Sequence, residues 1–284
     1  MLRNATNLLT KWNARKNRKP LIVWGARQVG KTYLVKDIFA EEYYSNSYIY
    51  IDFKIEDEIR DFCDHTANAE KIIEYICLYK GKDITKNTLL IFDEIQECPN
   101  IISSLKYFCQ DFREIPIIAT GSMVRIRLQR ELTRNGFTQK FMFPVGKIEQ
   151  LTIYPLSFDE FLLNSNEKLF NVTKKAYESR TPLNSSIHEL VLNEFYKYLL
   201  IGGMPEAVNT YFESNSFLES RRVLKDLYDN YLSDMELYQA SRESCLRSKN
   251  LFSNIYGQLN KESKNFSPGF IEEKTKTRDY FHPI

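Results

Sequence analysis

The chain has 284 residues, of which 43% are hydrophobic, 27% charged and 14% aromatic, an ordinary composition for a globular protein with a sizeable core. The formal net charge of +2 gives no electrostatic support for nucleic acid or a membrane as the main partner. No apolar run is long enough to span a bilayer, and residues 1–19 lack the apolar stretch of a signal peptide. The length allows one large domain or two modest ones.

The cysteines are odd in number, and no Cys-x-x-Cys pair occurs among them. No histidine lies at a metal-ligand spacing from any of them, so we do not expect a zinc site. We expect reduced thiols, which are typical of a cytoplasmic protein. The residues concerned are Cys63, Cys77, Cys98, Cys109 and Cys245.

The first expected element is an amphipathic helix over residues 1–19, which Pro20 stops. Its apolar stripe consists of Leu2, Leu8, Leu9 and Trp12. The basic residues at its end could meet phosphate or nucleic acid, but cations near the negative pole of a helix are the more ordinary reading. They are Arg15, Lys16, Arg18 and Lys19.

Residues 21–32 contain an apolar run followed by Gly-x-x-x-x-Gly-Lys-Thr. This order predicts a buried strand, a glycine-punctuated loop and the start of a helix, which together hold the phosphates of a nucleotide. We expect Lys31 to reach the β- and γ-phosphates and the Thr32 hydroxyl to ligate Mg²⁺. A chance match in a glycine turn is the alternative, and the strand–loop–helix context argues against it. The candidate nucleotide-binding residues are Gly25, Ala26, Arg27, Gln28, Val29, Gly30, Lys31, Thr32 and Tyr33.

A second strand is predicted over residues 48–53, with Asp52 near its carboxyl end, and a helix over residues 68–79 closes at Gly81. Residues 88–94 then form an apolar run that ends in two carboxylates. Such a run fits the centre of a parallel sheet, and ligands bind outside the carboxyl ends of these strands. We expect Asp93 to hold Mg²⁺, through water, and Glu94 to polarise an attacking water.

Residues 101–112 read as a helix, and residues 115–122 as a strand that ends in small polar residues. A hydroxyl there could sense the γ-phosphate or align the water, or it could serve the turn alone. The sequence does not fix which of the two hydroxyls, Thr120 or Ser122, faces the phosphates. Ser122 is the candidate nucleotide-binding residue.

A basic segment follows, in which one arginine could act as an arginine finger, although a solvated face is the commoner meaning of such a cluster. Its arginines are Arg125, Arg127, Arg130 and Arg134. Residues 147–156 supply a fifth strand, and Ser157 with Glu160 forms a capping-box pattern that starts a helix.

Beyond this point helical patterns replace strands. Residues 166–178, 186–200 and 216–239 look helical, and a Gly-Gly-Met-Pro break occurs at 202–205. We place a domain boundary near residue 160, with a P-loop ATPase core over 1–160 and a helical region over 161–284.

With these motifs located, the chain resembles the bacterial and archaeal P-loop ATPases of the AAA+-like class that carry a DUF4143-type C-terminal region. The resemblance rests on residues 19–32, 92–96, 119–122, 154–161, 198–207 and 267–279. It implies a three-layer α/β fold with five parallel strands and a central phosphate-loop strand, and it implies ATP and Mg²⁺ as ligands. A helical or winged-helix-like region and a nuclease-type module follow in relatives.

The chain ends at Ile284, about where that module would start, so we expect a truncated C-terminal region. Lys147 stands where relatives often have an arginine, which leaves the identity of any arginine finger open. No nuclease constellation is visible.

These observations favour Mg-dependent ATP hydrolysis, with Lys31 and Glu94 as the catalytic candidates and with nucleotide state coupled to a partner. The alternative is a nucleotide-gated switch that binds protein or DNA and hydrolyses little ATP. A small-molecule kinase uses the same loop, but Glu94 and the long helical region argue against it. The sequence is compatible with a homo-oligomer, and no membrane association is expected.

Overall fold

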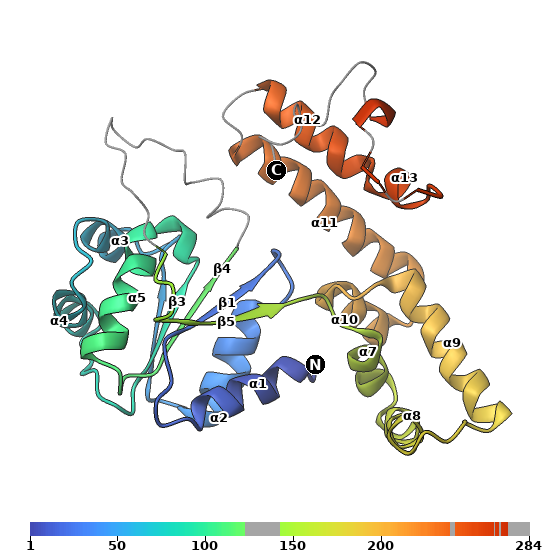
Figure 1. The fold of residues 1–284 in the computed structure, drawn as a ribbon, viewed down its shortest axis with the longest axis horizontal. Helices are drawn as coiled ribbons and strands as arrows, with labels where there is room; N and C mark the ends of the chain where they lie inside the picture. Colours follow the sequence, from blue (N-terminus) through green and yellow to red (C-terminus); the bar gives the residue numbers. More distant parts are fainter. Residues whose placement is uncertain (123–142, 239–241, 264, 267, 272–284) are drawn as a thin grey trace. The chain divides into compact units, whose positions relative to one another are not determined.

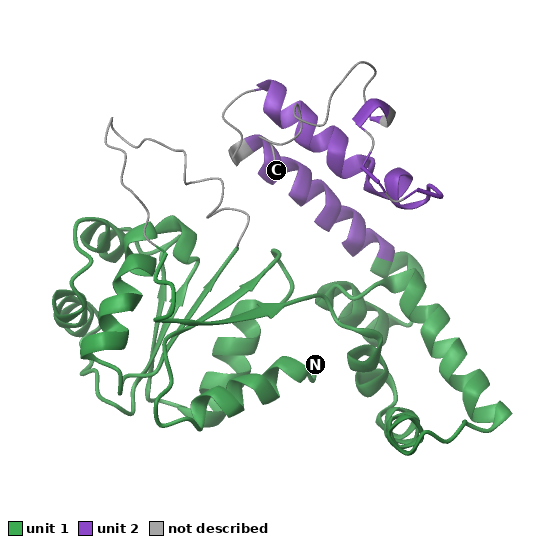
Figure 2. Cartoon of the chain, viewed as in Figure 1, with its two compact units in different colours: residues 1–220 green, residues 221–284 purple. Residues whose placement is uncertain are grey.

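The computed structural model describes residues 1–284 except 123–142, 239–241, 264, 267 and 272–284. It divides into two compact units, residues 1–220 and residues 221–284, which Figure 2 colours separately. The boundary expected near residue 160 lies inside the first unit and stays a prediction. The arginines of the basic segment, Arg125 to Arg134, lie outside the described residues.

The first unit is built on a sheet of five parallel strands in the order β2-β3-β4-β1-β5 (Figure 1). The α/β fold with a five-stranded parallel sheet is therefore confirmed. The strand that leads into the phosphate loop lies inside the sheet, between β4 and the edge strand β5, and β4 takes the middle position. The strands are β1 (Leu21–Gly25), β2 (Tyr48–Asp52), β3 (Leu89–Asp93), β4 (Ile117–Gly121) and β5 (Glu149–Ile153).

Helices cover both faces of this sheet, which makes the three layers (Figure 1). One face packs against α3 (Asp57–Asp64), α4 (Ala69–Lys80) and α5 (Pro99–Asp111). The other packs against α1 (Asn4–Asn13) and the π-helix η1 (Tyr33–Ala40), which continues into the short α2 (Glu41–Tyr43).

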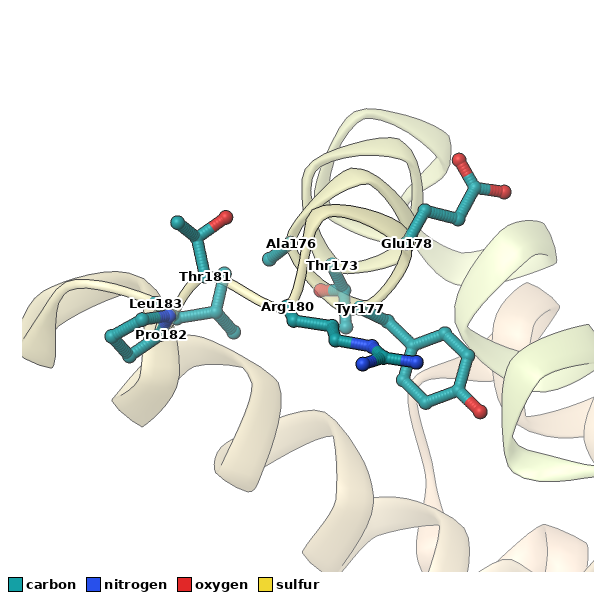
Figure 3. Close-up of a pocket in the computed structure, with 8 residues that line it drawn as sticks. All are labelled: Thr173, Ala176, Tyr177, Glu178, Arg180, Thr181, Pro182 and Leu183. Atoms are coloured by element: carbon teal, nitrogen blue, oxygen red, sulfur yellow. The ribbon is translucent and has the colours of Figure 1, made fainter.

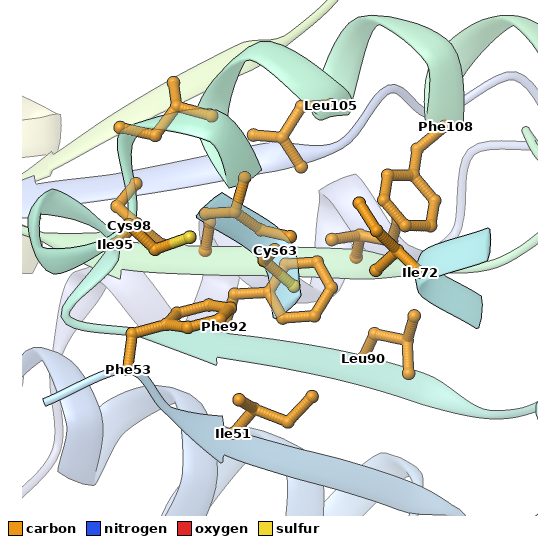
Figure 4. Close-up of a cluster of buried hydrophobic side chains, with 14 of the residues drawn as sticks. Ile51, Phe53, Cys63, Ile72, Leu90, Phe92, Ile95, Cys98, Leu105 and Phe108 are labelled. Atoms are coloured by element: carbon orange, nitrogen blue, oxygen red, sulfur yellow. The ribbon is translucent and has the colours of Figure 1, made fainter. Parts of the chain in front are cut away.

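Buried apolar side chains fill the space between the sheet and the first of these helical layers. Phe53 and Phe92 pack at a centroid distance of 5.8 Å, and Phe92 and Phe108 at 6.0 Å (Figure 4). Cys63 and Cys98 lie in the same cluster, where their hydrogen bond and burial raise the pKa of the Cys98 thiol. All five cysteines are free thiols. The strand ends are thus held rigidly by packed side chains.

The N-terminal helix is shorter than the sequence predicted, because α1 ends at Asn13 and not at Pro20. The chain turns back at this point: Trp12 Nε1 donates to the Lys19 carbonyl at 2.9 Å, and Arg18 Nη1 donates to the Asn13 carbonyl at 3.2 Å. An arginine thus satisfies a carbonyl at the end of the helix, as expected for a cation at the negative pole.

After β5 the regular elements of the described residues are all helical. The predicted capping box is present at the start of α7 (Phe158–Ser165), where Ser157 and Glu160 bond each other's backbone. Within the first unit α8 (Glu167–Ser179), α9 (Ser185–Ile201) and α10 (Pro205–Ser214) follow. Aromatic contacts pack these helices, including Phe161 with Tyr198 and Phe212.

The sequence did not predict several short helices. Helix α3 was missed because it is short, and α10 lies directly after the Gly-Gly-Met-Pro break. Helix α11 (Phe217–Tyr238) begins in the first unit and continues into the second, which also contains α12 (Arg242–Ser253), α13 (Ile255–Leu259) and the short η3 (Pro268–Phe270). Among the described residues, none of the helices combines the length and the apolar character that crossing a membrane requires.

Candidate nucleotide site

The loop between β1 and η1 has the backbone that its glycines predict. Gly30 has φ of 84°, and Gln28 shares this left-handed region with φ of 62°. Gly25 serves close packing instead, because a Cβ there would lie 2.5 Å from the Ile153 carbonyl oxygen of the adjacent strand. Alternation into positive φ turns successive N–H groups toward one side of the loop, which makes an anion-binding concavity.

Lys31 lies inside this loop and is only 9% exposed. Its Nζ donates to the carbonyl oxygens of Gly25 and Ala26 at 3.0 and 2.8 Å. Burial lowers the pKa of the Lys31 ammonium, while the carboxylates of Glu94 and Asp93 act in the opposite direction. A cation with so little water around it interacts strongly with an anion that enters the loop.

Asp93 ends β3 and faces the loop, as the sequence predicted. Its Oδ2 accepts from Thr32 Oγ1 at 2.7 Å and from Tyr50 OH at 2.8 Å. Its Oδ1 accepts from the Glu94 backbone N–H at 2.9 Å and from Thr120 Oγ1. Asp93 is 3% exposed, and these hydrogen bonds fix the orientation of its carboxylate from several sides.

Glu94 and Ser122 flank Asp93. The backbone of Glu94 is left-handed, with φ of 50°. Gln96 Nε2 donates to its carboxylate, and Gln96 Oε1 accepts from the Ser122 backbone N–H at 3.1 Å. The register that the sequence left open is now visible: the Thr120 hydroxyl donates to Asp93, whereas Ser122 makes its contact through the backbone.

A hollow of about 300 Å³ adjoins the loop beside Gly30. Tyr33 and Leu34 line it from η1, Leu156 from the segment after β5, and Pro205 and Asn209 from α10. Pro205 reaches the loop closely, because its Cγ lies 3.8 Å from the position that a Cβ on Gly30 would take. The hollow is thus lined both by η1, the helix that follows the phosphate loop, and by α10, which comes much later in the sequence.

Backbone pairing holds α10 at this hollow. Leu156 N donates to the Gly203 carbonyl at 2.7 Å, and Tyr198 OH donates to the Leu156 carbonyl at 2.8 Å. A side chain at Gly203 would place its Cβ 2.2 Å from the Leu156 oxygen, so only glycine permits this approach. The N-terminus joins here too, because Arg3 Nη1 donates to the Val29 carbonyl at 3.4 Å.

The residues present fit a nucleotide with Mg²⁺. Thr32 Oγ1 and Asp93 Oδ2 are 2.7 Å apart, close to the roughly 2.9 Å edge of an octahedron of oxygens around Mg²⁺. Mg²⁺ is commonly bound by one or two protein oxygens together with water and substrate phosphate, which matches this sparse donor set. The concave loop and the Lys31 ammonium suit the phosphates.

Several residues at this site were not predicted from the sequence. Tyr50 was predicted only as part of a strand, yet its hydroxyl donates to Asp93. Lys36 Nζ lies 4.5 Å from the centroid of the Tyr50 ring. Burial and the neighbouring Asp93 raise the pKa of Tyr50, so it stays a donor. The alternation of residues along β2, which puts Tyr50 on the same face as Tyr48, was the available signal.

A second hollow of about 720 Å³ lies where α8 turns into α9, and Figure 3 shows its lining. It is bordered by Tyr177, Arg180 and Pro182 among others, and it contains none of the predicted site residues. Size alone therefore does not identify the candidate site, whereas the phosphate loop does.

This sheet order, the loop between β1 and η1, and the Thr32–Asp93 contact define the class of P-loop nucleotide-binding proteins. A family model described as an AAA domain matches residues 17–162, and the chain belongs to that family. No curated protein matches the chain.

Solved structures with a similar fold include the Walker-type ATPase PABY2304 of Pyrococcus abyssi. It aligns with a TM-score of 0.50 and 18% identity over 93% of this chain and 84% of its own. AMPPCP-bound DnaA from Aquifex aeolicus aligns with a TM-score of 0.40 and 15% identity over 98% of this chain and 84% of its own. The first likeness concerns the fold alone, and the second carries no further conclusion.

Proposed function

We propose that this AAA-domain protein binds ATP with Mg²⁺ and hydrolyses it to ADP and phosphate. The loop of residues 25–33 would hold the phosphates through its N–H groups and the Lys31 ammonium. Thr32 and Asp93 would hold Mg²⁺, which when bound neutralises phosphate charge. Catalysis by such a site is mainly positioning and electrostatic stabilisation.

Glu94 is the proposed general base that orients and polarises the attacking water. It follows Asp93 directly, at the carboxyl end of β3, where ligands of parallel sheets bind. The hollow beside Gly30 is the proposed place of the nucleoside, between Tyr33 and Pro205. Its apolar lining with a few polar groups is typical of small-ligand sites.

The observation that carries this proposal is the 2.7 Å contact between Thr32 Oγ1 and Asp93 Oδ2. The test is phosphate release with saturating Mg-ATP by the purified chain, by Glu94→Gln and by a control, Glu74→Gln, whose side chain is exposed on α4. We expect Glu94→Gln to keep ATP affinity and to lose at least about 100-fold in turnover. Equal turnover in wild type and Glu94→Gln would remove Glu94 from this role.

A second candidate is a nucleotide-gated switch, which the shared lining of the hollow favours. A nucleotide there would touch both the phosphate-loop helix and α10, so its binding could order the two elements together. Hydrogen exchange of residues 205–214 with and without Mg-ATP tests this. We expect slower exchange with nucleotide, and unchanged exchange would count against the switch.

We further infer that the region after residue 160 is of the DUF4143 type. We also infer that the protein acts in the cytoplasm and that its nucleotide state is coupled to a protein or DNA partner. Supporting this are the resemblance over residues 198–207 and the place of Pro205 beside the phosphate loop. Mass measurement of the chain with ATP tests for a homo-oligomer, and ATPase assays with and without DNA test for that partner.

A further inference from the structure

A buried glutamine joins two parts of the candidate site across the ends of β3 and β4. Gln96 is 0% exposed and lies in the short helix η2 (Ile95–Glu97), directly after Glu94. Its Nε2 donates to Glu94 Oε2, and its Oε1 accepts from the Ser122 backbone N–H at 3.1 Å. Both ends of the amide are therefore engaged, one by a carboxylate and the other by the backbone.

The neighbouring strand makes room for this amide. A Cβ on Gly121 would lie 2.9 Å from Gln96 Oε1 and 2.9 Å from Ile95 Cγ1, closer than real Cβ contacts. Gly121 also precedes Ser122, whose N–H the amide accepts from. Glycine at this position in β4 thus permits the glutamine to reach across, and a methyl group there would displace it.

The backbone of Glu94 gives a reason for such a clamp. With φ of 50° and ψ of 45°, Glu94 adopts a left-handed conformation that a residue with a side chain rarely takes. Conformations of this kind persist only when the surroundings fix them, and they cluster at functional sites. The Gln96 amide is one such surrounding group, and it acts on the Glu94 side chain itself.

We propose that Gln96 is a positioning residue for Glu94, a role that rests on the hydrolase function proposed above. Its N–H holds one carboxylate oxygen of Glu94, and its carbonyl oxygen anchors that carboxylate to the backbone after β4. The position of the carboxylate is then fixed relative to Thr120, which donates to the proposed metal-binding Asp93. Gln96 acts on the chemical step and leaves phosphate binding to the loop.

The test compares steady-state ATP hydrolysis by wild type, Gln96→Glu and a control, Gln110→Glu. Gln96→Glu keeps the shape of the side chain but removes the N–H donor and opposes one carboxylate with another. We expect kcat to fall by about 10- to 100-fold, as small misplacements of reacting groups do, while KM changes by less than about twofold. Gln110→Glu makes the same chemical change at an exposed position of α5, and we expect it to leave kcat and KM unchanged.

Two further variants distinguish a specific loss of activity from a loss caused by misfolding. Gln96→Met removes both hydrogen bonds at similar size, and Gly121→Ala displaces the amide from the neighbouring strand. Each should show the same loss of kcat with KM kept, provided that thermal unfolding shows a folded protein. Wild-type kcat, a raised kcat, or a loss confined to KM in the folded variants would overturn the proposal.

The same experiment distinguishes failure of the hydrolase function from failure of the positioning role of Gln96. If wild type releases no more phosphate than Lys31→Ala, the hydrolase function fails and the positioning role falls with it. If wild type is active and Glu94→Gln is inactive, but Gln96→Glu, Gln96→Met and Gly121→Ala all keep wild-type kcat, only the role of Gln96 is wrong.

Discussion

The ends of two neighbouring strands, β2 and β3, carry aspartates that face the same edge of the sheet but differ in their surroundings. Asp52 and Asp93 are partners in the parallel register. Asp93 is almost fully buried and accepts from Thr32, Tyr50, Thr120 and the following N–H. Asp52 is partly exposed and accepts from the Lys54 N–H at 2.9 Å.

Two carboxylates at equivalent strand ends thus differ in their surroundings, and of the two only Asp93 has a described hydrogen bond to the phosphate loop. Burial raises the pKa of Asp52, and the nearby charges of Asp93 and Glu94 act in the same direction. Around Asp93, by contrast, hydrogen-bond donors converge on both oxygens, and one donor, Thr32, belongs to the phosphate loop. Several donors aimed at one carboxylate fix its orientation.

The largest expected effect comes from Asp93→Asn, with Asp52→Asn as the matched control. The amide cannot carry the charge, and its NH₂ group would face donors. We expect Asp93→Asn to lose at least about 100-fold in Mg-dependent turnover, whereas Asp52→Asn stays within about threefold of wild type. Phosphate release at several Mg²⁺ concentrations measures this. Equal losses in both variants would erase the difference between the two strand ends.

A smaller effect is expected from Thr120→Val, which keeps the shape of a fully buried residue but removes its hydroxyl from Asp93. Loss of one hydrogen bond to a charged group costs about 1.5 to 3 kcal/mol. The free energy of unfolding by urea should fall by about that amount. Thr152→Val on the edge strand β5 is the control. A similar fall in its free energy of unfolding would show that the hydrogen bond to Asp93 adds no stability beyond that of an ordinary threonine hydroxyl.

Tyr50→Phe removes the donor that comes from β2 and makes Asp93 more like Asp52. We expect a threefold to tenfold loss of turnover, about 1 kcal/mol of lost orientation, with ATP affinity kept. Tyr48→Phe is the control, because that hydroxyl donates to Glu41 at 2.6 Å, outside the site. An unchanged kcat in Tyr50→Phe would mean that the remaining donors suffice.

The smallest effect concerns the stability of Asp52→Asn. The pKa of Asp52 is raised in the folded protein, so wild type loses stability as pH rises above the ordinary value of 3.8 through the folded pKa. The uncharged variant should therefore melt slightly higher than wild type at neutral pH, and the gap should narrow as the pH is lowered toward 4. Melting curves recorded with a chelator test this, and a gap that widens on acidification would contradict it.

Much of this site could be predicted because its residues follow local patterns. The loop from Gly25 to Thr32 and the apolar run ending in Asp93 each carry their meaning in adjacent residues, and the fold brings them together. Gly81 and the Ser157 capping box were predictable for the same reason.

The rest depends on contacts between distant segments. Tyr50 and Gln96 reach the site through strand order and side-chain direction, and Pro205 reaches it from a helix far along the chain. The N-terminal helix was predicted too long for a different, local reason: the chain turns after Asn13, where Trp12 donates to the Lys19 carbonyl, and helical periodicity does not show this turn.

The most direct test of the central claim is the position of the metal in a crystal of the chain with a non-hydrolysable ATP analogue and Mn²⁺. Anomalous scattering should place one ion about 2.1 to 2.2 Å from Thr32 Oγ1, with Asp93 bound to it directly or through one water. An ion bound away from Thr32 and Asp93, with the nucleotide outside the loop of residues 25–33, would contradict the account.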